Sequence, residues 1–135
     1  MGNLRSGAVT AVVADDSIVF RTAFADFLAA IDVSVVGQVA SAESAVAMAK
    51  RVRPDVIFVD ACMPGMGGIA ACRQIRASCP GTRVVLMSAN PANLGGDPGT
   101  SGATAMVHKL DIVQSERLVE LVKQLMRQPA LGRSS

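Results

Sequence analysis

The sequence predicts an α/β fold in which a parallel sheet is covered by helices on both faces. Short apolar runs rich in β-branched residues alternate with amphipathic segments of helical length, and this alternation extends along most of the chain. The apolar runs lack polar residues at every second position, which indicates strands buried on both sides. With 135 residues the chain is long enough for one domain, predicted at 9–127 between a tail at 1–8 and a tail or linker stub at 128–135.

The first half of the chain contains two strands and two helices. Val9–Ala14 is the first predicted strand, and Ser17 is placed to cap the helix that follows. Val33–Val39 returns to an apolar strand pattern, and Ser41 opens a second helix. Pro54 closes this helix, because proline removes a backbone donor and constrains the residue before it. The apolar positions of the first helix recur at helical spacing: Val19, Phe20, Ala23, Phe24, Phe27, Leu28 and Ile31.

The second half repeats the pattern. DVIFVD (55–60) reads as a strand, GIAACRQIRAS (68–78) as a helix and RVVLMS (83–88) as a strand. Residues 104–108 make a fifth short strand, and a last helix is expected from about residue 113 to about residue 127. One face of this helix is apolar: Leu118, Leu121, Val122 and Leu125.

The segment NPANLGGDPGTSGA, residues 90–103, interrupts the pattern where a crossover helix belongs. Taking the glycines at 95, 96 and 99 at about 1 kcal/mol each and Pro98 at about 3 kcal/mol, a helix here costs about 6 kcal/mol relative to alanine. Leu94 is its only large apolar residue, so packing could not offset this cost. The fourth helix is therefore predicted to be absent or irregular. A tolerant loop without signalling meaning is the alternative explanation of the segment.

Polar residues stand at the carboxyl ends of the predicted strands. Asp15 and Asp16 follow the first strand, Asp60 ends the third, Ser88 ends the fourth and Lys109 follows the fifth. Ligands of open parallel sheets bind at this edge. If the first and third strands are neighbours, three carboxylates meet there, and they repel one another unless a cation lies among them. Oxygen ligands open to water suit magnesium, and a hydroxyl and an ammonium beside the ion indicate a phosphoryl site.

Four segments together resemble the receiver domain of two-component response regulators, such as the chemotaxis response regulator. They occur in the right order, each at a predicted strand end, within a resemblance that runs from about Val9 to Arg127: ADDS, PDVIFVDACMPGMGG, LMSA and MVHK. The resemblance implies a flavodoxin-like doubly wound sheet of five parallel strands in the order 2-1-3-4-5. It also implies a regulator that assists only its own phosphorylation and dephosphorylation and is otherwise not an enzyme.

By this resemblance, Asp60 is the phosphoacceptor that takes a phosphoryl group from a phosphohistidine of a sensor histidine kinase. Lys109 pairs with carboxylate or phosphoryl oxygens, and Ser88 donates a hydrogen bond to the new phosphoryl group. Physical reasoning agrees, because transfer to a carboxylate needs positioning and charge neutralisation but no general base. Taken alone, Asp60 also fits a turn aspartate after a strand.

The resemblance also implies a Mg²⁺ site. Asp16 and Asp60 bind the ion directly with the backbone carbonyl of Cys62, and Asp15 contributes through water. The alternative for the acidic pair is a structural one, since both side chains are placed to cap the first helix and to meet its positive end.

Three single positions depart from the family pattern. Met106 stands where many receivers have an aromatic residue that swings inward on phosphorylation, so the aromatic switch is missing. Leu110 replaces a common proline after the lysine, which makes a cis peptide there unfavourable by about 2.5 to 4 kcal/mol. Gly67 replaces a frequent acidic residue and is expected to loosen the loop after Asp60 slightly.

Composition excludes several other classes. The formal net charge is +2 with scattered basic residues, so direct nucleic-acid binding is not indicated. No apolar run reaches the roughly 18 residues that span a membrane, and no export signal is recognised, so a cytoplasmic protein is expected. Its cysteines, Cys62, Cys72 and Cys79, are expected to be reduced thiols, since they are odd in number and lack metal-site spacing.

Two functions from different classes therefore remain. The first is a phosphorylatable receiver that uses Asp60 and regulates a downstream protein or a C-terminal output domain, either as a stand-alone protein or as the N-terminal part of a longer regulator, with a homodimer left open. The second is a pseudo-receiver, an interaction or oligomerisation module that keeps the fold without using the site. The missing aromatic and the irregular fourth helix favour the second, and the intact acidic set with Ser88 and Lys109 favours the first.

Overall fold

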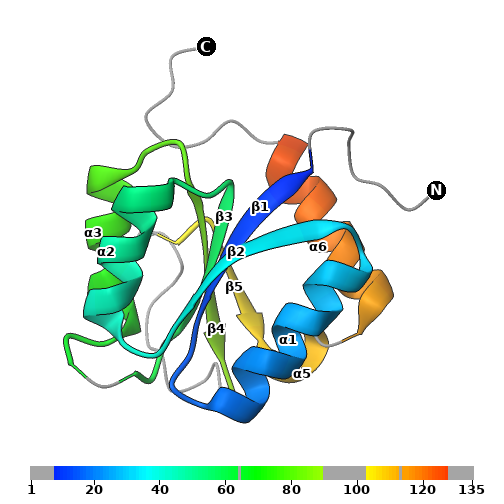
Figure 1. Ribbon diagram of the computed structural model, residues 1–135, viewed down its shortest axis with the longest axis horizontal. Helices are drawn as coiled ribbons and strands as arrows, with labels where there is room; N and C mark the ends of the chain where they lie inside the picture. The colour runs from blue at the N-terminus through cyan, green and yellow to red at the C-terminus, as the bar shows by residue number, and fades with distance from the viewer. Residues whose placement is uncertain (1–7, 64, 90–102, 113, 128–135) are drawn as a thin grey trace.

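The computed structural model describes residues 8–63, 65–89, 103–112 and 114–127. Its centre is a sheet of five parallel strands in the order β2-β1-β3-β4-β5, which confirms the predicted fold class and strand order (Figure 1). The strand bounds agree with the sequence prediction to within one residue: β1 Val9–Ala14, β2 Val33–Val39, β3 Val56–Asp60, β4 Arg83–Ser88 and β5 Ala105–His108.

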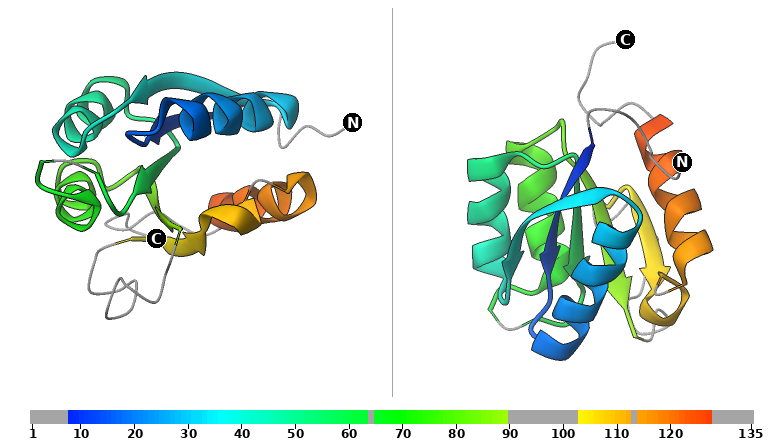
Figure 2. Two further views of the ribbon diagram at one scale, coloured as in Figure 1. Left: turned by 90° about the horizontal axis from the view of Figure 1, so that it is seen from below. Right: turned by 45° about the vertical axis from the view of Figure 1, so that its right-hand side comes forward.

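Helices cover both faces of the sheet, as the two views of Figure 2 make plain. Helices α2 and α3 lie on one face, and α1 and α6 lie on the other. No helix in the described ranges has both the length and the apolar content needed to cross a membrane. The helix bounds are α1 Ile18–Ala30, α2 Ala42–Val52, α3 Gly68–Ser78, α5 Lys109–Ile112 and α6 Ser115–Arg127.

The central strands are buried on both sides, which explains their continuous apolar sequences. Ile57 and Leu86 point into the core formed with α2 and α3. Their chain neighbours Phe58 and Met87 point into the core formed with α1 and α6. The strands are thereby held rigidly, and the residues at their carboxyl ends are held with them.

The two predicted serine caps are confirmed. Ser17 Oγ accepts the amide of Phe20 at 3.2 Å, and Ser41 Oγ accepts the amide of Ser44 at 3.1 Å. Each bond satisfies one of the amides that the first turn of a helix leaves without a partner. The cap at Ser17 fixes the start of α1 directly beside Asp15 and Asp16.

The apolar face predicted for α1 was too wide. Phe24, Ala25 and Leu28 are buried, but Val19 is 78% exposed and Ala23 is also exposed. The helix carries apolar residues around most of its circumference, so helical spacing alone does not identify the side that packs on the sheet.

A short helix that the sequence analysis did not predict follows β5. Helix α5 begins at Lys109, directly after the strand, and α6 begins at Ser115. The described residues contain no cis peptide bond, so the chain passes from Lys109 to Leu110 through a trans bond. The prediction of an absent or irregular fourth helix concerns residues 90–102, which lie outside the described residues.

Candidate functional site

The polar residues at the strand ends meet at one edge of the sheet, as the topology requires. Carboxylate oxygens of Asp15, Asp16 and Asp60 lie within 4.8 Å of one another. This edge is at the bottom of Figure 1, where β4 and β5 end and α1 begins. The acidic cluster that the sequence predicted is therefore present in the structure.

Asp15 is the anchored member of the cluster. It is fully buried, its Oδ1 accepts the amide of Ser17 at 2.8 Å, and its backbone carbonyl accepts Nη1 of Arg21 at 2.7 Å. Asp16, in contrast, is exposed. Of the two aspartates, it is Asp15 that has a structural role at the start of α1, because it accepts the amide of the capping serine. The Asp16 side chain is open to solvent.

Asp60 is 5% exposed at the end of β3. Its Oδ1 accepts the amide of Cys62 at 3.3 Å. Burial raises the pKa of Asp60 above its ordinary value of 3.8, and the charge of Asp15 raises it further, while the Cys62 amide and Lys109 partly offset both effects. A carboxylate crowded in this way favours a neighbouring cation.

Lys109 provides one positive charge at the cluster. Its Nζ lies 2.6 Å from Asp15 Oδ2 and 3.6 Å from Asp60 Oδ2, so the lysine bridges the ends of two strands. The same nitrogen lies 4.3 Å from the ring centroid of Phe20 on α1. These contacts place the ammonium between the strand ends and the first turn of α1.

Ser88 and His108 end neighbouring strands. Ser88 is 3% exposed at the end of β4 and is paired in register with His108 of β5. Nδ1 of His108 accepts the amide of Leu110 at 3.1 Å, which is a local role at the start of α5. On the other side of β4, Asp60 of β3 is paired in register with Met87, the residue before Ser88. The structure thus brings Ser88 and Asp60 to the same edge of the sheet.

Glu43, in the first turn of α2, is a contributor that sequence reasoning missed. Its Oε2 accepts the amide of Met66 at 3.0 Å, in the loop that follows Asp60. In the same loop Gly65 has a φ of +87°, and a side chain at that position would collide with the Glu43 carboxylate. The loop that carries Cys62 is therefore fastened to α2. No sequence motif signals this contact, because the two partners are 23 positions apart.

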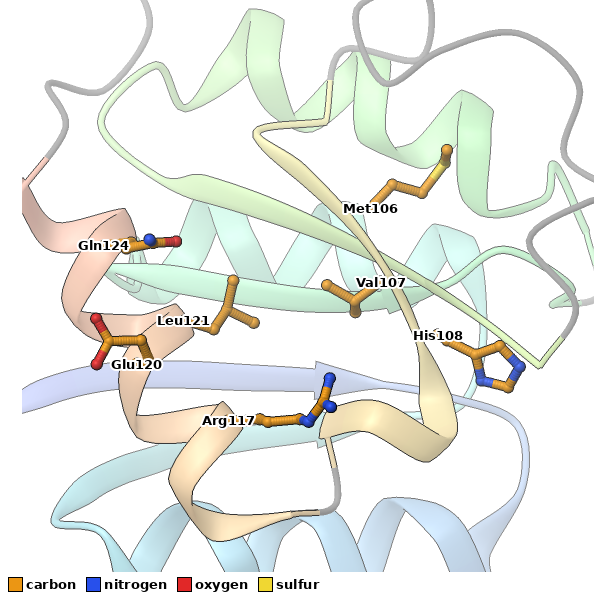
Figure 3. A pocket seen from close by; sticks show the side chains of 7 residues that line it. All are labelled: Met106, Val107, His108, Arg117, Glu120, Leu121 and Gln124. Atoms are coloured by element: carbon orange, nitrogen blue, oxygen red, sulfur yellow. The ribbon is translucent and has the colours of Figure 1, made fainter.

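A hollow of about 360 Å³ lies along the outer edge of β5, next to α6 (Figure 3). Val107 of the strand and Leu121 of the helix point toward one another across it, while Met106 points to the opposite face of the strand. In the described part of the chain β5 pairs with β4 alone. The lining side chains are Met106, Val107, His108, Arg117, Glu120, Leu121 and Gln124.

Comparison with known proteins agrees with this geometry. Residues 11–123 match the family model of the response regulator receiver domain. The chain belongs to this family. It is a receiver domain of the kind found in two-component signalling, a family that is generally not enzymatic, typically binds Mg²⁺ and interacts with histidine kinases and output domains.

Solved structures show the same architecture. The signal receiver domain of the putative response regulator NarL from Mycobacterium tuberculosis is 28% identical, with a TM-score of 0.76 over 93% of this chain and 98% of that one. The response regulator domain of Thermotoga maritima CheB is 26% identical, with a TM-score of 0.76 over 90% of this chain and 98% of that one.

The curated relatives are longer proteins. Response regulator GacA of Pseudomonas viridiflava is 38% identical over 59% of this chain and 38% of the relative. A protein-glutamate methylesterase/protein-glutamine glutaminase of Natronomonas pharaonis is 38% identical over 64% of this chain and 24% of the relative. The receiver is therefore similar to one part of each of these proteins.

Proposed function

We propose that this receiver accepts a phosphoryl group from a histidine kinase onto Asp60, with Mg²⁺, in the cytoplasm, and thereby regulates a downstream protein or an output domain. The observation that carries the proposal is the convergence of Asp15, Asp16 and Asp60 within 4.8 Å, with the Lys109 ammonium bridging two of them. A structural ion pair needs one carboxylate, whereas a phosphoryl site needs both the acidic set and the cation.

The residues fit a magnesium ion. Asp15 Oδ2 is buried and paired with the Lys109 ammonium at 2.6 Å, so Asp16 and Asp60 are the carboxylates of the cluster left for direct contact with an ion. The pKa of Asp60 is raised by its burial and by Asp15, a strain that a divalent cation would relieve. Exposed Asp16 leaves room for the waters that Mg²⁺ retains. Asp16, Asp60 and the Cys62 carbonyl would bind the ion directly and Asp15 through water.

The transfer itself requires little from the protein beyond position and charge. A carboxylate oxygen of Asp60 attacks the phosphorus, the phosphorus–nitrogen bond of phosphohistidine breaks, and the histidine departs with the bonding electrons and takes up a proton. The bound ion supplies charge neutralisation on the phosphoryl oxygens. Lys109 exchanges its contact with Asp60 Oδ2 for one with these oxygens, and the Ser88 hydroxyl donates to one of them.

Exposed apolar side chains next to the acidic cluster favour a protein as the phosphoryl donor. Ile18 and Val19 on the first turn of α1 are 65% and 78% exposed, and Leu110, which follows Lys109, is 70% exposed. A kinase that delivers a phosphoryl group to Asp60 must lie over this region and would cover these side chains. The hollow between β5 and α6 is a separate surface that suits the downstream partner.

Incubation with a small phosphodonor and Mg²⁺ tests the proposal. Intact-mass analysis is expected to find one added phosphoryl group, which Asp60→Asn abolishes and chelation of the metal prevents. Asp55→Asn is the matched control, because this aspartate binds Thr10 at the opposite end of β3. No added group in the native protein, or an added group that persists in Asp60→Asn, overturns the proposal.

The pseudo-receiver is the second candidate, favoured by Met106. This methionine packs with the core on the α2–α3 side and supplies no aromatic ring to the site. An assembly module would keep the same oligomeric state with and without a phosphoryl mimic such as beryllofluoride. The two functions are separated by size-exclusion chromatography with that mimic, combined with the mass measurement.

A further inference from the structure

The Lys109 ammonium lies in an enclosure formed by two anions and one aromatic ring. Asp15 and Asp60 supply the anions, and the ring centroid of Phe20 is 4.3 Å from Nζ. The lysine side chain is 15% exposed, so little water competes for the ammonium. A cation within about 6 Å of a ring face is attracted by the negative face of the π system, and the attraction grows as water is removed.

The ring is fastened to the acidic cluster through the first turn of α1. The amide of Ser17 donates to Asp15 Oδ1, the amide of Phe20 donates to Ser17 Oγ, and Arg21 donates to the Asp15 carbonyl. A shift of this turn would therefore carry Phe20 away from Lys109 and break bonds to Asp15 at the same time.

The far side of the ring is supported as well. Phe20 stacks on Phe24 with ring centroids 5.6 Å apart, and Phe24 meets Phe58 edge to face at 4.9 Å. Phe58 lies in β3, two residues before Asp60. The three rings thus connect the lysine with the strand that carries the acidic acceptor, on the face of the sheet opposite to Met106.

A purely structural reading of Phe20 is the competing explanation. The ring is half-buried and packs against the α1–α6 core, so its volume alone could account for it. The two explanations differ in what they require of the ring. Packing depends on shape, whereas attraction of an ammonium depends on the electron density of the ring face.

We infer that Phe20 is a positioning residue for Lys109: its ring face holds the ammonium between Asp15 and Asp60, ready for the phosphoryl group. A third carboxylate would fix the direction of the N–H groups by accepting hydrogen bonds from them. A ring face attracts the cation without imposing such a direction. The ammonium therefore stays in place but is free to turn its donors toward phosphoryl oxygens. This inference rests on the proposed transfer to Asp60.

Stepwise fluorination of the ring tests the inference, because it keeps the shape and weakens the negative face. Site-specific replacement of Phe20 by mono-, di- and trifluorophenylalanine is expected to lower the initial rate of Asp60 phosphorylation by a small phosphodonor step by step, about three- to tenfold in all. Phe20→Tyr keeps a rate near that of the native protein, and Phe20→Leu falls at least as far as the trifluoro variant. The same series at Phe27, half-buried farther along α1, leaves the rate unchanged.

A second measurement does not depend on phosphorylation. The ring should shift the proton resonances of the Lys109 ε-methylene upfield in the native protein, and Phe20→Leu should remove this shift. A flat fluorination series in a protein that does gain the phosphoryl group overturns the inference and leaves the proposed function standing. If the native protein gains no phosphoryl group, the proposed function falls and this role in the transfer falls with it. Absence of the ring-current shift overturns the contact itself.

Discussion

The ammonium of Lys109 lies closer to Asp15 than to Asp60, at 2.6 Å from Asp15 Oδ2 and 3.6 Å from Asp60 Oδ2. The side chain of Asp15 is fully buried, so water cannot solvate its charge. Lys109 is therefore primarily the ion-pair partner of Asp15 rather than of Asp60. In this state Lys109 stabilises the folded chain, and its more distant contact with Asp60 is the one that can be exchanged for a phosphoryl oxygen.

Removal of the Lys109 ammonium is therefore expected to destabilise the fold. Lys109→Met keeps the aliphatic stem and should lower the free energy of unfolding by about 3 kcal/mol, the lower end for a broken buried ion pair. Urea denaturation of both proteins in the absence of divalent ions measures this difference in the free energy of unfolding. Arg127→Met is the control, because the Arg127–Glu120 pair spans 3.9 Å between side chains that are 64% and 65% exposed and is worth at most about 1 kcal/mol.

The pairing is tested further in the Asp15→Asn background. Once the buried charge is gone, Lys109→Met should cost clearly less than in the native protein. Equal costs in the two backgrounds would contradict the assignment of Lys109 as the partner of Asp15.

Asp60→Asn is expected to stabilise the metal-free protein at neutral pH. Burial and Asp15 raise the pKa of Asp60 above 3.8, so the folded state binds the Asp60 proton more tightly than the unfolded state. The Asp60 contribution to stability therefore falls as the pH rises from 3.8 through the raised value, and the loss is complete above it. Urea denaturation should show Asp60→Asn to be more stable than the native protein at pH 7, with a gap that closes toward pH 3.8. A less stable variant at pH 7 would contradict the raised pKa.

Sequence reasoning placed these polar residues at one edge of the sheet because they stand at strand ends. Asp60 and Ser88 each follow a run of buried residues, Lys109 follows a half-buried strand, and parallel topology forces such positions to one edge. Glu43 was missed, and the contact of Phe20 with Lys109 was missed, since both depend on how helices α1 and α2 lie on the sheet. The start of α5 at Lys109 was missed because a helix of four residues is too short to show a periodic apolar face.

The exposure of α1 shows the limit of hydrophobic periodicity. Val19 and Phe24 both fit an apolar helical face, yet Val19 is 78% exposed and Phe24 is fully buried. Hydrophobicity does not separate them, and only packing on the sheet does. Val19 is among the exposed residues that the proposed phosphoryl donor would cover.

A set of glycine substitutions is expected to separate backbone strain from collision in the loop after Asp60. Gly65 and Gly67 have φ angles of +87° and +86°, but only at Gly65 would a side chain meet the Glu43 carboxylate. Gly67→Ala should cost about 1 kcal/mol from backbone strain alone. Gly65→Ala should cost about 1 kcal/mol more, because the Glu43 carboxylate must move aside and give up its hydrogen bond with the Met66 amide. In the Glu43→Ala background the two glycine substitutions should cost the same. Gly81→Ala, where nothing lies within 4 Å and φ is unstrained, should be nearly neutral in urea denaturation. Equal costs at Gly65 and Gly67 would contradict the contact with Glu43.

Alkylation of the cysteines is expected to distinguish one thiol next to the site from two in the core. All three are free; Cys62 is exposed, while Cys72 and Cys79 are buried, and burial raises the pKa of Cys72 to about 12. Iodoacetamide at pH 8 should therefore modify Cys62 first, because the thiolate is the reactive form and Cys72 hardly forms it. Peptide mapping measures the order, and comparable rates at all three positions would contradict the described burial.

The modified protein then reports on Asp60. The Cys62 amide donates to Asp60 Oδ1 at 3.3 Å, so a bulky group on this side chain crowds the loop beside the acceptor. We expect alkylation to slow phosphorylation of Asp60 by a small phosphodonor, whereas Cys62→Ser treated with the same reagent should keep its untreated rate. If the alkylated native protein keeps its full rate, the Cys62 side chain does not border the path of the phosphoryl group. If the treated Cys62→Ser variant slows instead, the effect comes from Cys72 or Cys79, and the core thiols are more accessible than their burial implies.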